Sequence, residues 1–349
     1  MTKEKNPLSL HLDVSDFLPA DNEEKQSLVV MRQSVSFWRD GLRRFRKNKI
    51  AMTSLVIIIL TMIFAFIGPV FYPYTYEQQI RGSENLAPMQ YSETELALKA
   101  QGEKVFPHIL GTDSLGRDTM VRLMMGSRVS LLVGIVASVL VLLIGSIYGA
   151  VAGYFGGKVD LIMMRIVDII YTVPDILIII LLMVTLKYPL ENLANTVPGF
   201  AWINTIGVGL ICIFIVFSLL YWVGMARIVR SQILMLKEQE FVTAAKALGA
   251  SHRRIIRKHL LTNCMGTLIV TTTLQIPSSI FTESFLSFIG IGVAAPMPSL
   301  GSMASQAING ISSYPYRLLA PAIMISLIIL SFNLIGDGLR DAFDPKLKD

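Results

Sequence analysis

Few residues in this sequence have the type and spacing that enzyme chemistry requires. Two of the four histidines, His252 and His259, share one polar stretch but accompany no nucleophile–base pair and no metal-ligand spacing. The two cysteines, Cys212 and Cys264, have no metal-ligand pattern around them, and we interpret them as buried thiols. The G-x-x-x-x-G-K-[ST] pattern that binds ATP phosphates is also missing. We therefore assign no catalytic residue, metal ligand or cofactor to this chain.

The ionisable residue of greatest chemical interest is Glu283, which lies within a long apolar segment. A charged group in such a place is costly and usually faces the interior of a helix bundle or a water-filled cavity. The stretch "GIGVAAPMP" at 290–298 breaks the helix that follows, so backbone there can line a pathway. We predict that Glu283 and Ser287 face the outer part of a path through the membrane. The alternative is an interfacial carboxylate that snorkels or pairs with a loop residue.

Other polar residues within apolar segments could form the ion sites of a secondary transporter. These residues are Arg165, Asp168, Asp175 and Asn333. Secondary transporters often place such groups on broken helices in corresponding positions of two repeats. The stretch "YTVPDI" at 171–176 does break one apolar segment, but we find no counterpart and no internal repeat. A secondary transporter is thus a less favoured alternative, and an intramembrane enzyme is weaker still.

The apolar segments that must position these residues identify an integral membrane protein. The chain has 349 residues, of which 53% are hydrophobic and 16% charged, whereas about a quarter of the residues in a soluble domain are charged. Several apolar runs have the length of about 20 residues that a bilayer core requires. We predict an all-α fold with six transmembrane helices, over residues 50–72, 129–153, 161–186, 203–226, 264–289 and 318–336.

Basic residues predict how these spans are oriented. The 227–263 loop carries eight basic residues against two acidic ones, and six more basic residues precede the first span. By the positive-inside rule, both termini and the 227–263 loop are cytoplasmic, and the 73–128 loop is external. The net charge of +6 is then a signal of topology, and we expect no nucleic-acid partner.

The segments outside the spans differ in character. Residues 1–25 are acidic and without a clear period, and we expect a disordered cytoplasmic tail. Residues 26–49 place apolar side chains at helical spacing opposite arginines, which predicts an amphipathic helix in the lipid headgroup region, with a soluble surface helix as the alternative. The 73–128 loop is too long for a simple connection and should have structure of its own. Its "GTDSLGRD" at 111–118 predicts a tight turn before a helix.

Three glycines in the second span predict close helix packing. Gly145, Gly149 and Gly153 lie four residues apart and therefore share one helix face. A face of this kind lets another helix approach closely within lipid.

The cytoplasmic stretch "EFVTAAKALGASHRRIIRKHLL", residues 240–261, predicts two short helices joined by a sharp turn. An apolar face on the first helix is expected from Phe241, Ala244, Ala245 and Leu248, since these lie at i, i+3, i+4 and i+7. Gly249 can end this helix in the left-handed conformation, and Ser251 can cap the next one. The stretch suits either docking of another protein on the alanine face or a connector resting on anionic lipid.

Part of this stretch resembles a loop of bacterial ABC importer permeases. "TAAKALG", residues 243–249, is similar to the E-A-A-x3-G loop that docks into the ATPase subunit of those importers. Thr243 stands where glutamate is usual, and "HLLT" at 259–262 stands where the family often has I-x-L-P.

Two further segments resemble the dipeptide/oligopeptide branch of that family. They are "GTDSLGRDTMVRLMMGSRVSL" at 111–131 and "ESFLSFIGIG" at 283–292. The similarity covers most of residues 30–345 in the expected order. The chain is identified as a member of this branch, similar to its second permease subunit.

The resemblance implies a fold, a complex and a set of docking residues. The fold would be that of a type I ABC importer permease, in a bacterial cytoplasmic membrane. Its partners would be membrane lipid, a second homologous permease, two subunits that hold ATP and Mg, and an extracellular or periplasmic peptide-binding protein. Coupling to the ATPases would use residues 238–261, with contacts from Glu240, Thr243, Ala244, Ala245, Gly249, Arg253 and Arg254. The cargo would be a peptide, with nickel complexes, glutathione or cell-wall peptides as alternatives.

Overall fold

The computed structural model describes residues 37–343, which fold almost entirely into helices. Within this part of the chain the extended pairing is limited to an isolated bridge between Thr112 and Asp118. The predicted disordered tail over 1–25 lies outside the described residues, as does the first part of the predicted 26–49 helix. The described remainder of that segment contains α2 (Phe37–Lys47).

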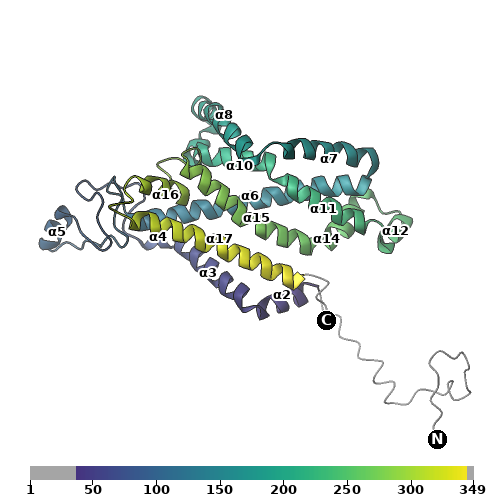
Figure 1. The fold of residues 1–349 in the computed structure, drawn as a ribbon, viewed down its shortest axis with the longest axis horizontal. Coiled ribbons are helices and arrows are strands. Elements are labelled where there is room, and N and C mark those ends of the chain that lie inside the picture. Colours follow the sequence, from purple (N-terminus) through teal and green to yellow (C-terminus); the bar gives the residue numbers. More distant parts are fainter. Residues whose placement is uncertain (1–36, 344–349) are drawn as a thin grey trace, which may run out of the picture. The chain divides into compact units, whose positions relative to one another are not determined.

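Long apolar helices make up most of the unit that begins at Gly41 (Figure 1). Within residues 37–343, five stretches are long and apolar enough to cross a membrane, and a sixth is added if a helix pair bent by 68° counts as one span. The number agrees with the six predicted spans when the bent pair is counted, and it confirms the all-α membrane fold. The spans are α3 (Lys49–Phe66), α6 (Thr119–Phe155), α8 (Asp175–Thr196), α10 (Val208–Leu220) with α11 (Trp222–Leu236), α15 (Met265–Phe288) and α17 (Tyr316–Phe343).

The predicted third span, 161–186, is wrong because it merges two helices. The chain forms α7 (Gly157–Thr172), a break, and then α8, which runs ten residues beyond the predicted end. Val173, the residue before a proline, is extended with φ −93° and ψ 136°, because the ring of Pro174 disfavours a helical conformation there. Both halves are apolar, so hydropathy alone does not separate them.

The second span begins earlier than predicted. Helix α6 has 37 residues and starts at Thr119 rather than near residue 129. Asp118 fixes this start, because its Oδ1 accepts a hydrogen bond of 2.9 Å from the backbone N–H of Val121. The predicted turn before a helix at 111–118 is thus confirmed, and the loop between the first two spans ends at residue 118.

Helix α6 lies at the centre of the bundle, between two groups of helices (Figure 1). Leu131 packs with side chains of α3, α15 and α17 such as Ile58, Ile280 and Ile328. Val133 packs in a second cluster that includes Ile213 of α10. Helix α6 therefore contacts most of the elements that carry candidate functional residues.

The glycine face of α6 receives α11, as the glycine spacing predicts. A Cβ atom built on Gly149 would lie 2.3 Å from the carbonyl oxygen of Ala226, and one on Gly145 would lie 2.6 Å from the Met225 Cβ. Any larger residue at these positions would push the two helices apart.

The loop over residues 72–118 has structure of its own, as predicted. It contains α5 (Glu93–Ala100), which begins with a capping box formed by Ser92 and Glu95. Further short helices lie elsewhere in the chain: α4 (Gly68–Phe71), η2 (Pro198–Phe200), α9 (Trp202–Ile206) and α16 (Leu300–Ile308).

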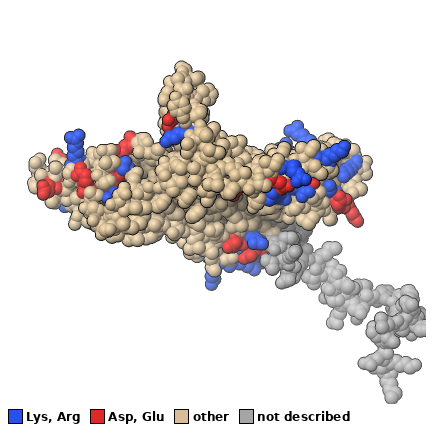
Figure 2. Space-filling view, turned by 45° about the horizontal axis from the view of Figure 1, so that its top comes forward, with Lys and Arg blue, Asp and Glu red and all other residues tan. Residues whose placement is uncertain are grey.

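Charged side chains gather toward the α5 region and the α12 region, and the surface between these regions is largely uncharged (Figure 2). This distribution is the one that a membrane-crossing bundle requires, because charged groups in the hydrocarbon layer are costly.

Candidate functional site

The stretch that resembles a docking loop folds as a helix, a sharp turn and a second helical run. We call residues 237–264 the α12 segment. Helix α12 (Glu240–Ala247) ends before Gly249, which has φ +74° as predicted. The second run consists of α13 (His252–Arg254), the π-helical turn η3 (Ile255–Leu260) and α14 (Leu261–Asn263). Ser251 occupies the N-cap position, but its side chain makes no capping hydrogen bond, so that part of the prediction is wrong.

The predicted apolar face of α12 is divided between the protein interior and the surface. Ala245 is buried together with Val242, which is 0% exposed. Ala244 is exposed with Phe241, and Leu248 is 88% exposed. The expectation that Ala245 shares an outer face with these three residues is wrong, because α12 is rotated so that Ala245 packs toward η3.

The remaining predicted docking residues lie on the surface of this segment. Glu240 and Thr243 are exposed on α12, and Gly249 has open space around it. Arg253 and Arg254 are exposed and line an open hollow of about 500 Å³. Arg257 and Lys258 complete its basic wall. The structure thus presents an apolar patch and a basic hollow on one short segment.

Contacts inside the chain hold the back of the α12 segment. Val242, Ile255 and Leu260 are completely buried and belong to one apolar cluster with Tyr154 near the end of α6. The Tyr154 hydroxyl lies 2.7 Å from His252 Nδ1, and Lys237 Nζ donates to the Gly153 carbonyl at 3.2 Å. Sequence reasoning missed the Tyr154–His252 contact, because 98 residues separate the pair.

Glu283 is enclosed within the chain rather than placed near its surface. It is 0% exposed, and its carboxylate accepts hydrogen bonds from Ser130 Oγ at 2.8 Å and Ser287 Oγ at 2.7 Å. Ser287 Oγ also accepts a bond of 3.0 Å from the Val293 N–H, which ties the broken stretch after α15 to the same site. A snorkelling carboxylate is excluded because Glu283 is completely buried. The alternative of pairing with a loop residue stays open, because Ser299, just before α16, also hydrogen-bonds the carboxylate. The role of Glu283 and Ser287 in a path stays a prediction.

A cavity of about 310 Å³ lies beside the break between α7 and α8. Its polar lining residues are Tyr171, Asp175, Tyr221, Gln275, Ser278 and Thr282. The Tyr221 hydroxyl donates to Thr282 Oγ1 at 2.7 Å, which joins α15 to the junction between α10 and α11. Tyr221 and Thr282 lie well inside their spans, so the cavity offers polar groups within the membrane-crossing bundle.

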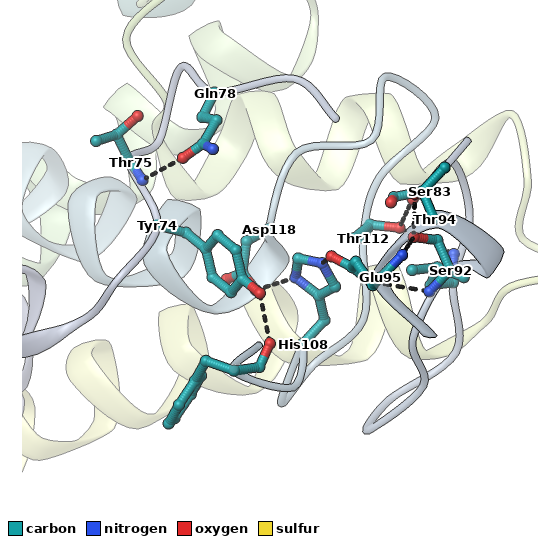
Figure 3. Close-up of polar contacts among 12 residues, drawn as sticks. Tyr74, Thr75, Gln78, Ser83, Ser92, Thr94, Glu95, His108, Thr112 and Asp118 are labelled. Carbon is teal, nitrogen blue, oxygen red and sulfur yellow. Dashed lines mark hydrogen bonds and ion pairs between the residues drawn. The ribbon is translucent and has the colours of Figure 1, made fainter. Parts of the chain in front are cut away.

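A buried charge network holds the 72–118 loop (Figure 3). His108 is 0% exposed and lies between two carboxylates, with Nδ1 2.7 Å from Asp118 Oδ2 and Nε2 2.9 Å from Glu95 Oε1. Burial alone lowers the pKa of His108, but the hydrogen bonds and charges of Asp118 and Glu95 outweigh it and raise the pKa. The Tyr74 ring stacks on the imidazole at 4.5 Å between centroids. The sequence signals only the capping box of Glu95 and the turn at Asp118, not their meeting at His108.

Residues 37–343 contain no group of three or more His, Cys, Asp or Glu side chains placed to hold a metal ion. The candidate sites are the exposed surface of the α12 segment and the polar groups within the bundle.

Comparison with known families places the chain among membrane transport components. Residues 145–349 match the family described as binding-protein-dependent transport system inner membrane component. Residues 36–88 match the N-terminal TM domain of oligopeptide transport permease C.

Individual relatives are similar over nearly the whole chain. The oligopeptide transport system permease protein OppC of Bacillus subtilis is 42% identical and covers 95% of this chain and 97% of its own length. The dipeptide transport system permease protein DppC of the same organism is 42% identical and covers 99% of this chain and 98% of its own length. OppC of Haemophilus influenzae is 39% identical and covers 94% of this chain and 93% of its own length. An inward-facing structure of the MetNI methionine ABC transporter has a TM-score of 0.48 and 19% identity, over 65% of this chain and 98% of that one.

These matches confirm the resemblance found in the sequence motifs. The chain belongs to the family of binding-protein-dependent transport system inner membrane components.

Proposed function

We propose that this chain is the membrane-spanning subunit of an ATP-driven peptide importer. It forms half of a path through a bacterial cytoplasmic membrane, together with a second homologous permease. Two ATP-binding subunits, which carry ATP and Mg, drive transport, and an extracellular or periplasmic binding protein delivers the peptide. The names of the oligopeptide and dipeptide permeases support peptide as the cargo. Nickel complexes, glutathione and cell-wall peptides are the alternative cargoes.

The observation that carries this proposal is the exposed apolar patch on α12, formed by Phe241, Ala244 and Leu248. A leucine that is 88% exposed gains stability only when another surface covers it. The buried side chains behind the patch fix its position, so a force on the patch reaches the end of α6 through Tyr154. We propose that an ATPase subunit covers the patch and that the basic hollow of Arg253 and Arg254 faces that subunit or the inner leaflet.

Orientation follows from the same proposal. The α12 segment and both termini lie on the cytoplasmic side, and the 72–118 loop lies outside. Helix α6 supports this arrangement, because its 37 residues span about 55 Å between the loop and the α12 segment.

The coupling proposal is tested with the exposed leucine. Leu248→Glu places a charge in the patch without disturbing a buried contact, so the chain should fold and enter the membrane normally. Loss of one buried leucine from an interface corresponds to about 1.5–3 kcal/mol, or roughly 10- to 150-fold weaker association. Association is measured by co-purification with the ATPase subunits, and ATP-dependent peptide uptake by reconstitution in proteoliposomes.

The matched control is Leu96→Glu, which changes a 52% exposed leucine of α5 in the 72–118 loop. This variant should keep ATPase association at the wild-type level. Normal association of Leu248→Glu would exclude the patch as the docking surface, and wild-type uptake without ATP would favour a secondary transporter.

We also propose that the cavity beside the α7–α8 break belongs to the transport path. Asp175 offers a negative charge there to the cationic groups of a passing peptide, and the polar lining allows water to enter. Asp175→Asn should lower peptide uptake about three- to tenfold while ATP hydrolysis continues, and Asp175→Glu should restore most of it. The control Glu191→Gln lies near the other end of α8 and should transport normally.

Glu283 has a different proposed part in that path. Its hydrogen bond from Ser130 joins α6 to α15, and the bond from Ser287 fixes the carboxylate on α15, so Glu283 can hold the closed arrangement of the two helices. Glu283→Gln keeps the shape but weakens these bonds. We expect retained ATP hydrolysis with reduced uptake, and a larger loss for Glu283→Ala. Wild-type uptake by both variants would assign Glu283 to folding alone.

A further inference from the structure

A small cavity lies where the 72–118 loop meets α6, α16 and α17. Its volume is about 20 Å³, and its polar lining comes from Asp113, Thr119, Arg122, Gln306 and Arg317. Such a volume holds a single particle of about the size of a water molecule. These five residues come from four separate parts of the chain, so the cavity lies where those parts meet.

Positive charge exceeds negative charge around this cavity. Arg117, Arg122 and Arg317 are 6%, 2% and 6% exposed, and Asp113 is 7% exposed. Asp113 Oδ2 lies 2.7 Å from Arg117 Nε and 3.5 Å from Arg122 Nε. Among the described residues Asp113 is the one carboxylate paired with any of these arginines. Three guanidinium groups therefore share one carboxylate, so the group as a whole carries an excess of two positive charges, and Arg317 has no ion-pair partner among the described residues.

Neutral oxygens satisfy some of the arginine donors but cannot balance the charge. Gln306 Oε1 accepts from Arg117 Nη2 at 3.2 Å and from Arg122 Nη2 at 3.0 Å. Asn85 Oδ1 accepts from Arg317 Nη1 at 2.7 Å. These amides orient the guanidinium groups, whereas an uncompensated buried charge costs several kcal/mol.

Two donors that line the cavity have no partner within the described protein. Arg122 Nη1 and Thr119 Oγ1 are both buried, and neither atom has a hydrogen-bond partner among the described residues. Buried polar groups are almost always hydrogen-bonded, and leaving a charged donor unsatisfied is particularly costly. Both donors belong to the same short stretch at the start of α6, so one occupant can satisfy them together.

We propose that this cavity binds one small monovalent anion of the chloride class, held by Arg122, Thr119 and Arg317. The small volume favours a monatomic anion over sulfate, phosphate or a carboxylate ligand. A water molecule could accept the free hydrogen bonds, but it would leave the excess charge in place. Arg122 holds the anion and pairs with Asp113 of the 72–118 loop, so the site fastens that loop to the bundle helices that supply Gln306 and Arg317.

The test measures the thermal unfolding of the full-length purified protein as sodium gluconate is replaced by sodium chloride at constant ionic strength. We expect a saturable rise in Tm with chloride and with bromide, and none with sulfate. Thr119→Val removes one donor and keeps the side-chain shape, so it should raise the half-saturating chloride concentration at least about fivefold. Arg122→Gln should abolish the dependence.

The matched control is Thr61→Val, which removes a buried hydroxyl that donates to the Ile57 carbonyl on α3, away from the cavity. It should keep the wild-type chloride dependence even if its Tm is lower. Bromide soaked into crystals should give an anomalous peak between Arg122 and Thr119. A Tm independent of chloride, or the same dependence in Thr119→Val as in the wild type, would overturn the proposal in favour of water. None of these measurements requires transport, so they stand apart from the test of the proposed function.

Discussion

The 72–118 loop and the α12 segment adjoin opposite ends of α6, but they handle charge in opposite ways. In the loop, Glu95, His108 and Asp118 are buried and pair with one another. In the α12 segment, Arg253 and Arg254 are exposed and form no ion pair within the described part of the chain. The Glu95–His108–Asp118 group of the loop is thus paired internally, whereas the arginines of the α12 segment are left for another surface. Buried charges that pair with one another are typical of a region that stabilises the fold. Exposed charges on a buried apolar base are typical of a region that binds a partner.

The largest expected effect tests the loop. Asp118→Ala removes the cap of α6 and the partner of His108, and it also removes the acceptor of a 3.2 Å hydrogen bond from the Tyr72 hydroxyl. Breaking a buried pair on one side costs about 3–5 kcal/mol. Hydrogen exchange over residues 72–118 should rise strongly, while exchange in the α12 segment stays unchanged.

The control for Asp118 is Glu103→Ala, which removes an exposed carboxylate of the same loop. Exchange in this variant should match the wild type. If Asp118→Ala also left the loop protected, the buried network would not be what holds the loop together.

A smaller effect tests the α12 segment. Gly249 has φ +74°, and no atom lies within 4 Å of a Cβ built there. Gly249→Val therefore adds no clash, but the left-handed conformation costs a β-branched residue about 1–2 kcal/mol. We expect normal insertion into the membrane, weaker ATPase association and reduced transport.

A Gly249→Asn variant distinguishes the effect of backbone strain at this position from the effect of adding any side chain. Because asparagine tolerates the left-handed conformation, Gly249→Asn should retain most association and transport. Equal losses in the valine and asparagine variants would mean that a partner contacts Gly249 directly, and no loss in either would remove it from coupling.

The smallest effect concerns pH. The folded state raises the pKa of His108 above its value in the unfolded chain, so protonated His108 stabilises the loop. This stabilisation is fully present below pH about 6.5 and is lost as the pH rises through the raised pKa. Hydrogen exchange over 72–118, corrected for its intrinsic pH dependence, should increase across that window. This pH dependence of exchange should vanish in His108→Gln. If the variant kept the same pH dependence, a titratable group other than His108 would be its cause.

Local patterns in the sequence predicted the features that depend on one element. The glycine face of α6, the left-handed Gly249 and the turn before Thr119 each follow from residue type and spacing. Features set by long-range contacts were not predictable in this way. Ser130 and Glu283 are 153 residues apart, and nothing in either segment specifies the other. The rotation of α12 that buries Ala245 likewise depends on η3 and α6, which a helical period alone does not describe.

The unbroken length of α6 has a mechanical consequence for both regions. A straight helix of 37 residues behaves as a rod of about 55 Å, so a tilt of about 5° around its midpoint displaces each end by about 2 Å in opposite directions. Tyr154 lies near one end of this rod and Asp118 caps the other. Under the proposed coupling, a displacement imposed at the α12 segment would therefore move the opposite end of α6 across the membrane. The loop must move as a body with its end of the rod, and its internally paired charges allow it to do so without unfolding.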